Sequence, residues 1–159
     1  MPIIDAGNRC PDFELPEADG ETVSLASLAG RPFVLFFFPK VDTSGCTTEA
    51  LDFSARLSEF EAAGVRVLGV SPDPIKKQCK FRDKHGLSVD LLADEERTLI
   101  EPAGVWVEKS MYGRKYMGVE RSTLLVDGAG KIVRAWPKVS VPGHADEVLA
   151  AARELGGSA

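Results

Sequence analysis

The residues best suited to chemistry in this sequence are three cysteines, Cys10, Cys46 and Cys79. Their odd number and wide spacing are a poor framework for structural disulfides, and the sequence contains no C-x-x-C pair. Zinc binding is not expected, because His85 and His144 lie far from any clustered pair of cysteines. What remains is the chemistry of a free thiol, or the packing of ordinary buried cysteines.

Cys46 has the most suggestive local sequence of the three. It follows the apolar run FVLFFF at 33–38, which has the length and composition of a strand buried on both faces. Pro39 ends this strand, because a proline nitrogen cannot donate to a sheet ladder. The turn-forming residues 42–45 follow, and we expect a helix to begin at or near Cys46. The unpaired N–H groups of a helix N-terminus favour a thiolate, so Cys46 is either a nucleophile or a small buried residue.

A carboxylate lies close to this thiol in the sequence. Glu49 would take the N3 position of a capping box if Cys46 were the cap residue. A free negative charge so close would oppose a thiolate. We therefore expect Glu49 to pair with an arginine.

The rest of the chain predicts the elements that position these residues. In the first part of the chain, we expect a β-hairpin of 13–15 and 22–25 about an Asp-Gly turn, a helical turn at 27–30, the strand 33–38 and a helix from 46 to about 62. A strand at 65–70, a helix at 75–85, a short strand at 91–92 and a helical turn from 94 to about 99 should follow. The rest of the chain predicts an irregular excursion over 101–119, a hairpin of 122–127 and 131–136, and a last helix after 142–143. This order predicts a three-layer α/β fold of thioredoxin type, with a central mixed β-sheet flanked by helices. We expect one domain over residues 1–159.

Composition excludes several classes of function. The net charge of −5 argues against a nucleic-acid-binding surface, which would be basic. No apolar run reaches the roughly 18 residues needed to span a membrane. Residues 1–5 lack the basic and apolar regions of a signal peptide. We therefore expect a cytoplasmic protein, in a compartment that keeps thiols reduced.

The longer sequence around Cys46 resembles a known family. Pro39-x-x-x-Thr43-x-x-Cys46 matches the Pro-x-x-x-Thr/Ser-x-x-Cys signature of the peroxiredoxins. The string FPK-x-x-T-x-GCTTEA is similar to the subgroup called bacterioferritin comigratory protein, or PrxQ. Further similar segments are PDF at 11–13, GVSPD at 69–73, KHGL at 84–87 and RSTLLVD at 121–127.

This resemblance implies a thiol-dependent peroxidase for hydrogen peroxide and organic hydroperoxides, on a thioredoxin fold with an N-terminal β-hairpin extension. Cys46 would be the peroxidatic nucleophile and would become a sulfenic acid. Thr43 would hold the peroxide, Pro39 would shield the thiolate from water, and Arg121 would be a second cation near the sulfur. The residues agree, because an arginine at the edge of a buried strand is costly unless it pairs with an anion. The alternative for Arg121 is a solvated arginine at a strand edge.

The resemblance also implies a second thiol that resolves the sulfenic acid. Many relatives carry it five residues after the peroxidatic cysteine, where this chain has Leu51. Others carry it on the helix after the Ser-Pro-Asp turn, where this chain has Cys79. Cys79 is about 200° around that helix from Phe81, so we expect it to face outward. The alternative is that Cys79 packs with Ile75 and is inert.

The same resemblance implies no metal and no bound cofactor. Recycling by thioredoxin or a similar dithiol is expected, in a monomer or weak homodimer that binds neither nucleic acid nor membrane. Two alternatives remain open: a one-cysteine peroxidase resolved by an external thiol, and a non-catalytic thioredoxin-like binding or holdase protein. For Cys10 we expect a small buried residue.

Overall fold

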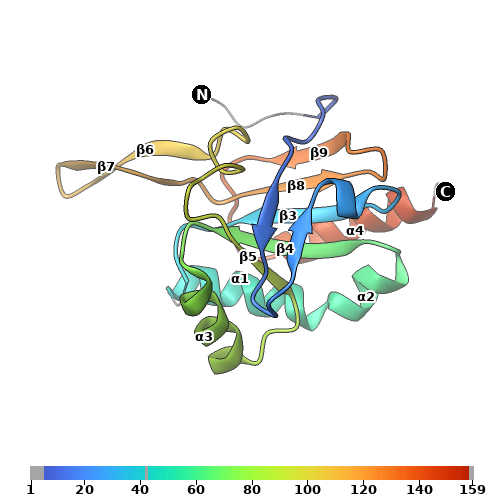
Figure 1. Ribbon diagram of the computed structural model, residues 1–159, viewed down its shortest axis with the longest axis horizontal. Helices are drawn as coiled ribbons and strands as arrows, with labels where there is room; N and C mark the ends of the chain where they lie inside the picture. The colour runs from blue at the N-terminus through green and yellow to red at the C-terminus, as the bar shows by residue number, and fades with distance from the viewer. Residues whose placement is uncertain (1–5, 42, 158–159) are drawn as a thin grey trace.

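A mixed β-sheet organises the computed structural model, which describes residues 6–41 and 43–157 (Figure 1). Within these residues the sheet has five strands in the order β5-β4-β3-β8-β9. Their bounds are Phe33–Phe37 (β3), Arg66–Ser71 (β4), Asp90–Ala93 (β5), Ser122–Val126 (β8) and Ile132–Trp136 (β9). β4 pairs parallel with β3 and with β5, whereas β8 pairs antiparallel with β3 and with β9. The predicted mixed sheet is confirmed. Residues 1–5, where we expected no signal peptide, and Asp42 of the predicted turn 42–45 lie outside the described residues.

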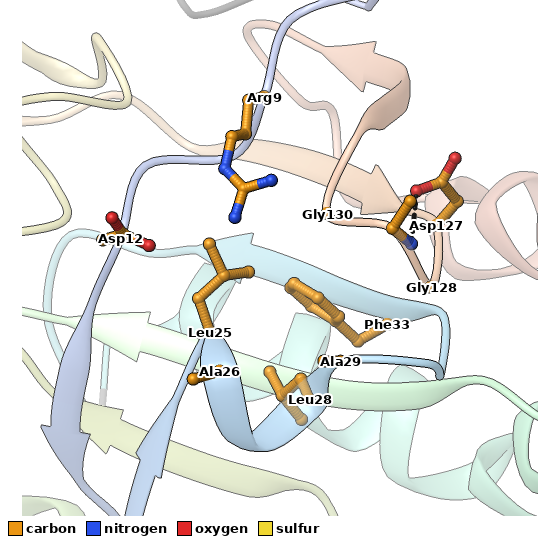
Figure 2. A pocket seen from close by; sticks show the side chains of 11 residues that line it. Arg9, Asp12, Leu25, Ala26, Leu28, Ala29, Phe33, Asp127, Gly128 and Gly130 are labelled. Carbon is orange, nitrogen blue, oxygen red and sulfur yellow. Dashed lines mark hydrogen bonds between the residues drawn. The ribbon is translucent and has the colours of Figure 1, made fainter.

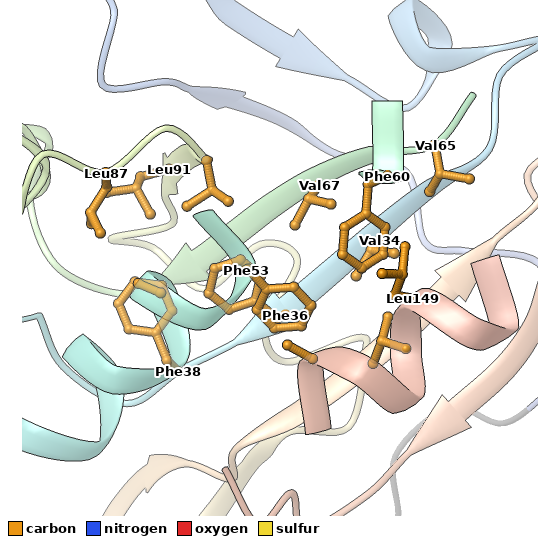
Figure 3. Close-up of a cluster of buried hydrophobic side chains, with 14 of the residues drawn as sticks. Val34, Phe36, Phe38, Phe53, Phe60, Val65, Val67, Leu87, Leu91 and Leu149 are labelled. Atoms are coloured by element: carbon orange, nitrogen blue, oxygen red, sulfur yellow. The ribbon is translucent and has the colours of Figure 1, made fainter. Parts of the chain in front are cut away.

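The strand β3 separates two hydrophobic clusters, because its side chains alternate between the faces of the sheet. Val34, Phe36 and Phe38 point towards the helices (Figure 3). The helices are α1 (Ser44–Ala55), α2 (Leu57–Ala62), α3 (Ile75–His85) and α4 (His144–Gly157). The Phe53 ring of α1 stacks on Phe36, with 4.6 Å between the ring centroids. Burial on both faces explains why the sequence of β3 is continuously apolar.

The other face of the sheet is covered without an α-helix of the described chain. Side chains of the hairpin β1 (Glu14–Pro16) and β2 (Thr22–Ser24), of the 3₁₀ helix η1 (Ala26–Leu28) and of the turns after β5 pack there. The N-terminal hairpin and the central mixed sheet were both predicted, but the layer on this face is formed by the hairpin, η1 and turns rather than by the helices that a three-layer α/β fold would place there. In Figure 1 the hairpin is drawn in blue in front of the sheet.

The predicted irregular excursion at 101–119 is wrong from residue 106 onward. The chain there forms an antiparallel hairpin of β6 (Trp106–Met111) and β7 (Arg114–Val119), which projects from the body (Figure 1). Its two-residue turn has positive φ at Tyr112 (53°) and at Gly113 (76°). Such a turn fits the twist of a hairpin, but Tyr is unusual at its first position, so the sequence signal was weak.

Two helix predictions also need correction. The predicted helix 46–62 begins two residues earlier, at Ser44, and is interrupted at Arg56. The Arg56 guanidinium donates to the carbonyl of Asp52 at 2.9 Å and pairs with Asp146 of α4, which holds this break against another helix. The predicted helical turn at 94–99 is a set of turns, where the Asp94 carboxylate accepts backbone N–H groups. None of the described helices is long and apolar enough to cross a membrane.

Candidate active site

Cys46 lies in the first turn of α1, directly beyond the carboxyl end of the central strand β3. Thr43 is the N-cap residue of this helix, so Cys46 is its third residue and not its cap. The capping box that we expected if Cys46 were the cap residue therefore does not form, because Glu49 lies almost one turn beyond the N3 position. The Cys46 thiol is still close to the unpaired N–H groups at the helix start, which favour an anion there. The side chain is buried, at 1% exposure.

Arg121 brings a positive charge to this thiol from the residue just before β8. Its Nη2 donates to Cys46 Sγ at 3.2 Å, and its Nη1 donates to Glu49 Oε1 at 2.7 Å. Burial works against the charge of Arg121, but the charges of Glu49 and Cys46 outweigh it and raise the arginine pKa. The expected pairing of Glu49 with an arginine is confirmed. One guanidinium thus binds both the sulfur and the carboxylate.

Glu49 is held in an unusual state by this arrangement. Burial raises its pKa to about 7, and Arg121 opposes this rise without cancelling it. Its second oxygen, Oε2, has no hydrogen-bond partner among the residues that the structure describes. Near neutral pH the Glu49 carboxyl is therefore divided between a neutral and a charged form, and only the charged form competes fully for Arg121.

The loop between β3 and α1 is held in place by a buried aspartate that the sequence analysis did not single out as a site residue. Asp73 Oδ2 accepts the backbone N–H of Val41 at 2.9 Å and the hydroxyl of Ser71 at 2.8 Å. Gln78 of α3 donates to the same Ser71 hydroxyl at 2.7 Å. The signal was present in the Ser-Pro-Asp sequence after β4, where polar residues follow a buried strand directly.

A cavity of about 610 Å³ opens beside this loop. Pro39, Thr43, Gly45 and Arg121 line it on the side of the buried thiol, and both strands of the β6–β7 hairpin supply the opposite side. The hairpin residues that line it are Trp106, Lys109, Tyr116, Met117, Gly118 and Val119. Trp106 and Tyr116 are rim residues.

Thr43 makes its own hydrogen bond within this loop. Its Oγ1 donates to the Lys40 carbonyl at 3.0 Å, and no side-chain cap bond is made to the start of α1. Because a hydroxyl has two lone pairs, the same oxygen can still accept a hydrogen from a ligand in the cavity.

Cys79 does not face outward as predicted. Its side chain is half-buried and packs against the hydrophobic cluster on the helix side of the sheet. Its Sγ donates to the carbonyl of Ala18, in the turn between β1 and β2, at 3.1 Å. The helical angle from Phe81 describes α3 alone. The β1–β2 hairpin covers the side of α3 on which Cys79 lies. Cys46 and Cys79 are both free thiols.

Cys10 lies apart from the site and is buried, at 1% exposure. Burial raises the pKa of its thiol to about 12, and Asp12 adds to this rise. A small cavity of about 110 Å³ near this segment is lined by Arg9, Asp12 and Asp127 among others (Figure 2). None of the predicted site residues lines it. The prediction of a small buried residue is confirmed for Cys10.

A mixed sheet, a buried thiol in the first turn of the helix after its central strand, and an arginine bonded to that sulfur define a thioredoxin-fold thiol enzyme. Comparison with known proteins agrees. Residues 6–135 match the sequence model of the AhpC/TSA family. Peroxiredoxin Bcp of Bacillus subtilis is 43% identical over 152 residues, which are 96% of this chain and 97% of the relative. Peroxiredoxin Bcp of Xanthomonas campestris is 46% identical over 140 residues, 88% of each chain.

Solved structures give the same result. A structure of Xanthomonas campestris peroxiredoxin Q has a TM-score of 0.86 and 44% identity, and the match covers 91% of each chain. The chain belongs to the AhpC/TSA family and, within it, to the Bcp/PrxQ peroxiredoxins. It is a thiol-dependent peroxidase, an oxidoreductase that reduces peroxides with electrons from a thiol reductant.

Proposed function

We propose that this protein reduces hydrogen peroxide and organic hydroperoxides at Cys46. The observation that carries the proposal is the 3.2 Å contact between Arg121 Nη2 and Cys46 Sγ, in the first turn of a helix. A guanidinium and a helix N-terminus both favour the thiolate, which is the nucleophilic form of a cysteine. Neither Cys10 nor Cys79 has such surroundings.

The chemistry begins when the Cys46 thiolate attacks the nearer oxygen of the peroxide. A sulfur–oxygen bond forms, the O–O bond breaks, and the electron pair leaves on the distal oxygen, which takes up a proton to give water or an alcohol. Sulfur is oxidised to a sulfenic acid and the peroxide is reduced. Arg121, between sulfur and cavity, stabilises the negative charge as it moves from sulfur to oxygen.

The cavity residues have separate roles in this step. Thr43 accepts the hydrogen of the attacked oxygen through the lone pairs that its bond to Lys40 leaves free. Pro39 lines the cavity without offering an N–H group to water, and so shields the thiolate. Glu49 acts through Arg121, whose guanidinium it holds at 2.7 Å, and is a positioning residue.

We further propose that Cys79 resolves the sulfenic acid. Its thiolate attacks the Cys46 sulfur, hydroxide leaves and takes up a proton as water, and a Cys46–Cys79 disulfide forms. A disulfide needs the two Cα atoms within about 7 Å, and we propose that the first turn of α1 unwinds to deliver Cys46. Thioredoxin or a similar dithiol then reduces the disulfide, in a reducing compartment such as the cytosol. The single domain acts as a monomer or weak homodimer.

One observation favours a second route. Cys79 is half-buried and its thiol is already bonded to Ala18. If that contact persists, an external thiol resolves Cys46 directly and the protein works as a one-cysteine peroxidase.

Mass spectrometry of the reduced protein after one equivalent of hydrogen peroxide separates these routes. We expect a loss of two hydrogens and a peptide map that joins Cys46 to Cys79. The variant C79S should instead keep one added oxygen on Cys46, and the control C10S should behave as the wild type. A persistent sulfenic or sulfinic Cys46 in the wild type establishes the one-cysteine route. Full peroxidase activity in C46S would refute the proposal as a whole.

A further inference from the structure

The turn between β1 and β2 gathers three carboxyl groups away from the thiol site. One carboxylate oxygen from each of Glu17, Asp19 and Glu21 lies within 4.8 Å of the other two. Asp19 and Glu21 are exposed, whereas Glu17 is buried, at 3% exposure. Charged glutamates are almost never so buried unless they have a partner of opposite charge.

The neighbours of the Glu17 side chain are other carboxyl groups and not cations. Its Oε2 has no hydrogen-bond partner among the residues that the structure describes. Its carboxyl faces those of Asp19 and of Asp90 in β5; burial first, and these two groups next, raise its pKa to about 9. Ionised carboxylates only accept hydrogen bonds, so they cannot satisfy one another without a proton or a cation between them.

The nearby arginines do not balance these charges. Arg66 of β4 pairs with Asp90 at 2.9 Å, and Arg82 of α3 pairs with Asp83 at 3.2 Å. Both lie near enough to act on Asp19 electrostatically, yet neither bonds to Glu17. Asp90 therefore has its own arginine partner, whereas Glu17, Asp19 and Glu21 have none among the described residues, because Arg82 is engaged with Asp83.

We propose that this turn binds a hard divalent cation, with Ca²⁺ as the preferred ion. All the available ligand atoms are oxygens, which suit Ca²⁺ and Mg²⁺ rather than zinc or copper. Two oxygens that each lie about 2.4 Å from one calcium ion are at most about 4.8 Å apart, and the three carboxylates satisfy this limit. Calcium also tolerates irregular geometry, and water completes its shell on the exposed side of Asp19 and Glu21.

The turn is already shaped before an ion binds. Glu17 N–H donates to the Glu21 carbonyl at 2.8 Å, and Asp19 Oδ1 accepts the Glu21 N–H at 3.0 Å. Ala18 N–H donates to the carbonyl of Leu91 at 3.0 Å, which fixes the turn to β5. Little conformational freedom is therefore lost when an ion binds.

Isothermal titration of calcium chloride into reduced, chelator-treated full-length protein tests the proposal. We expect saturable binding at pH 8. E17Q and D19N should each lose at least tenfold in affinity. The matched control is E14Q, which removes an exposed carboxylate from β1 of the same hairpin, outside the cluster.

Thermal unfolding provides the second readout. At ten times the wild-type dissociation constant, calcium should raise the melting temperature of the wild type and E14Q by about 4 °C, and that of E17Q and D19N by no more than about 1 °C. Because Asp19 is exposed, D19N keeps the test valid if E17Q fails to fold. A wild type that shows neither binding heat nor a melting shift up to 10 mM calcium refutes the site, and the cluster is then a shared-proton cluster. Equal binding by the wild type and D19N refutes it as well.

Discussion

At the scale of single residues, the site depends on how Arg121 is shared between two acids. Its guanidinium donates to Cys46 Sγ and to Glu49 Oε1 with different nitrogens. The space for it is narrow, because a Cβ on Gly45 would lie 3.2 Å from Nη2. Glu49 therefore holds the guanidinium by one nitrogen while the other nitrogen donates to the sulfur.

The raised pKa of Glu49 gives a prediction with a defined sign. The native state binds this proton more tightly than the unfolded state does, so stability from Glu49 is fully present below about pH 4.5 and is lost as pH rises through about 7. The free energy of unfolding of the wild type, minus that of E49Q, should therefore fall between pH 4.5 and 8, by up to about 3 kcal/mol. Urea unfolding at several pH values measures this difference. A difference that rises with pH would show that Arg121 keeps Glu49 ionised throughout.

At the scale of elements, the site is a junction between the end of β3 and the start of α1, supported by the end of β4. Asp73 provides the support, because it binds the N–H of Val41 and the hydroxyl of Ser71 inside the protein. The β6–β7 hairpin lines the cavity beside this loop. Loop residues and a projecting hairpin thus contribute to the same cavity.

Removing that support should affect both stability and catalysis. D73A leaves the buried donors of Val41 and Ser71 without their acceptor, which costs about 1–3 kcal/mol. We expect kcat/KM for hydrogen peroxide to fall at least tenfold, because Thr43 and Pro39 shift with the loop. D73N is the matched control, since its amide oxygen can still accept and should recover most of the loss. Wild-type kinetics in a folded D73A protein would contradict this role.

At the scale of the whole molecule, the packing on the two faces of β3 holds the site elements together. The packing on the helix side is tight at Gly69 of β4, which lies opposite Phe36 in the parallel register. A Cβ there would lie 2.6 Å from Phe36 Cζ, and Phe36 is itself stacked on Phe53 of α1 (Figure 3). A methyl group at position 69 of β4 would therefore disturb the packing of α1, the helix that carries Cys46.

G69A should lower the free energy of unfolding by about 1–3 kcal/mol, because an overpacked core must displace a ring that has no free space. G118A is the control: it is also a strand glycine, but its Cβ would meet only the flexible end of Lys109 and the ring of Tyr116 at 3.4–3.6 Å. Chemical denaturation compares the two variants. Equal stability of G69A and G118A would show that the aromatic cluster can move to make room.

Much of this architecture could be predicted from local sequence. The run 33–38 determined a buried strand, and Pro39 with the turn residues after it determined its end. Gly86 determined the end of α3, where it adopts φ of 61°. Such features are local because a few neighbouring residues set the hydrophobic periodicity and the turn chemistry. The same local signals, with the resemblance they carried, indicated the family.

The tertiary structure decided which distant groups meet, and of the following contacts the family resemblance had implied only that of Arg121 with the sulfur. Arg121 reaches a sulfur 75 positions earlier in the chain, and the hairpin turn at Ala18 covers Cys79, which α3 alone would have left outward. The break at Arg56 follows contacts with Asp146, 90 positions away. The hydrophobic periodicity of the sequence does not indicate such contacts, because they depend on how whole elements pack. The sequence by itself therefore determined the strand, the thiol and the helix that carries it, whereas the packing decided what surrounds the thiol.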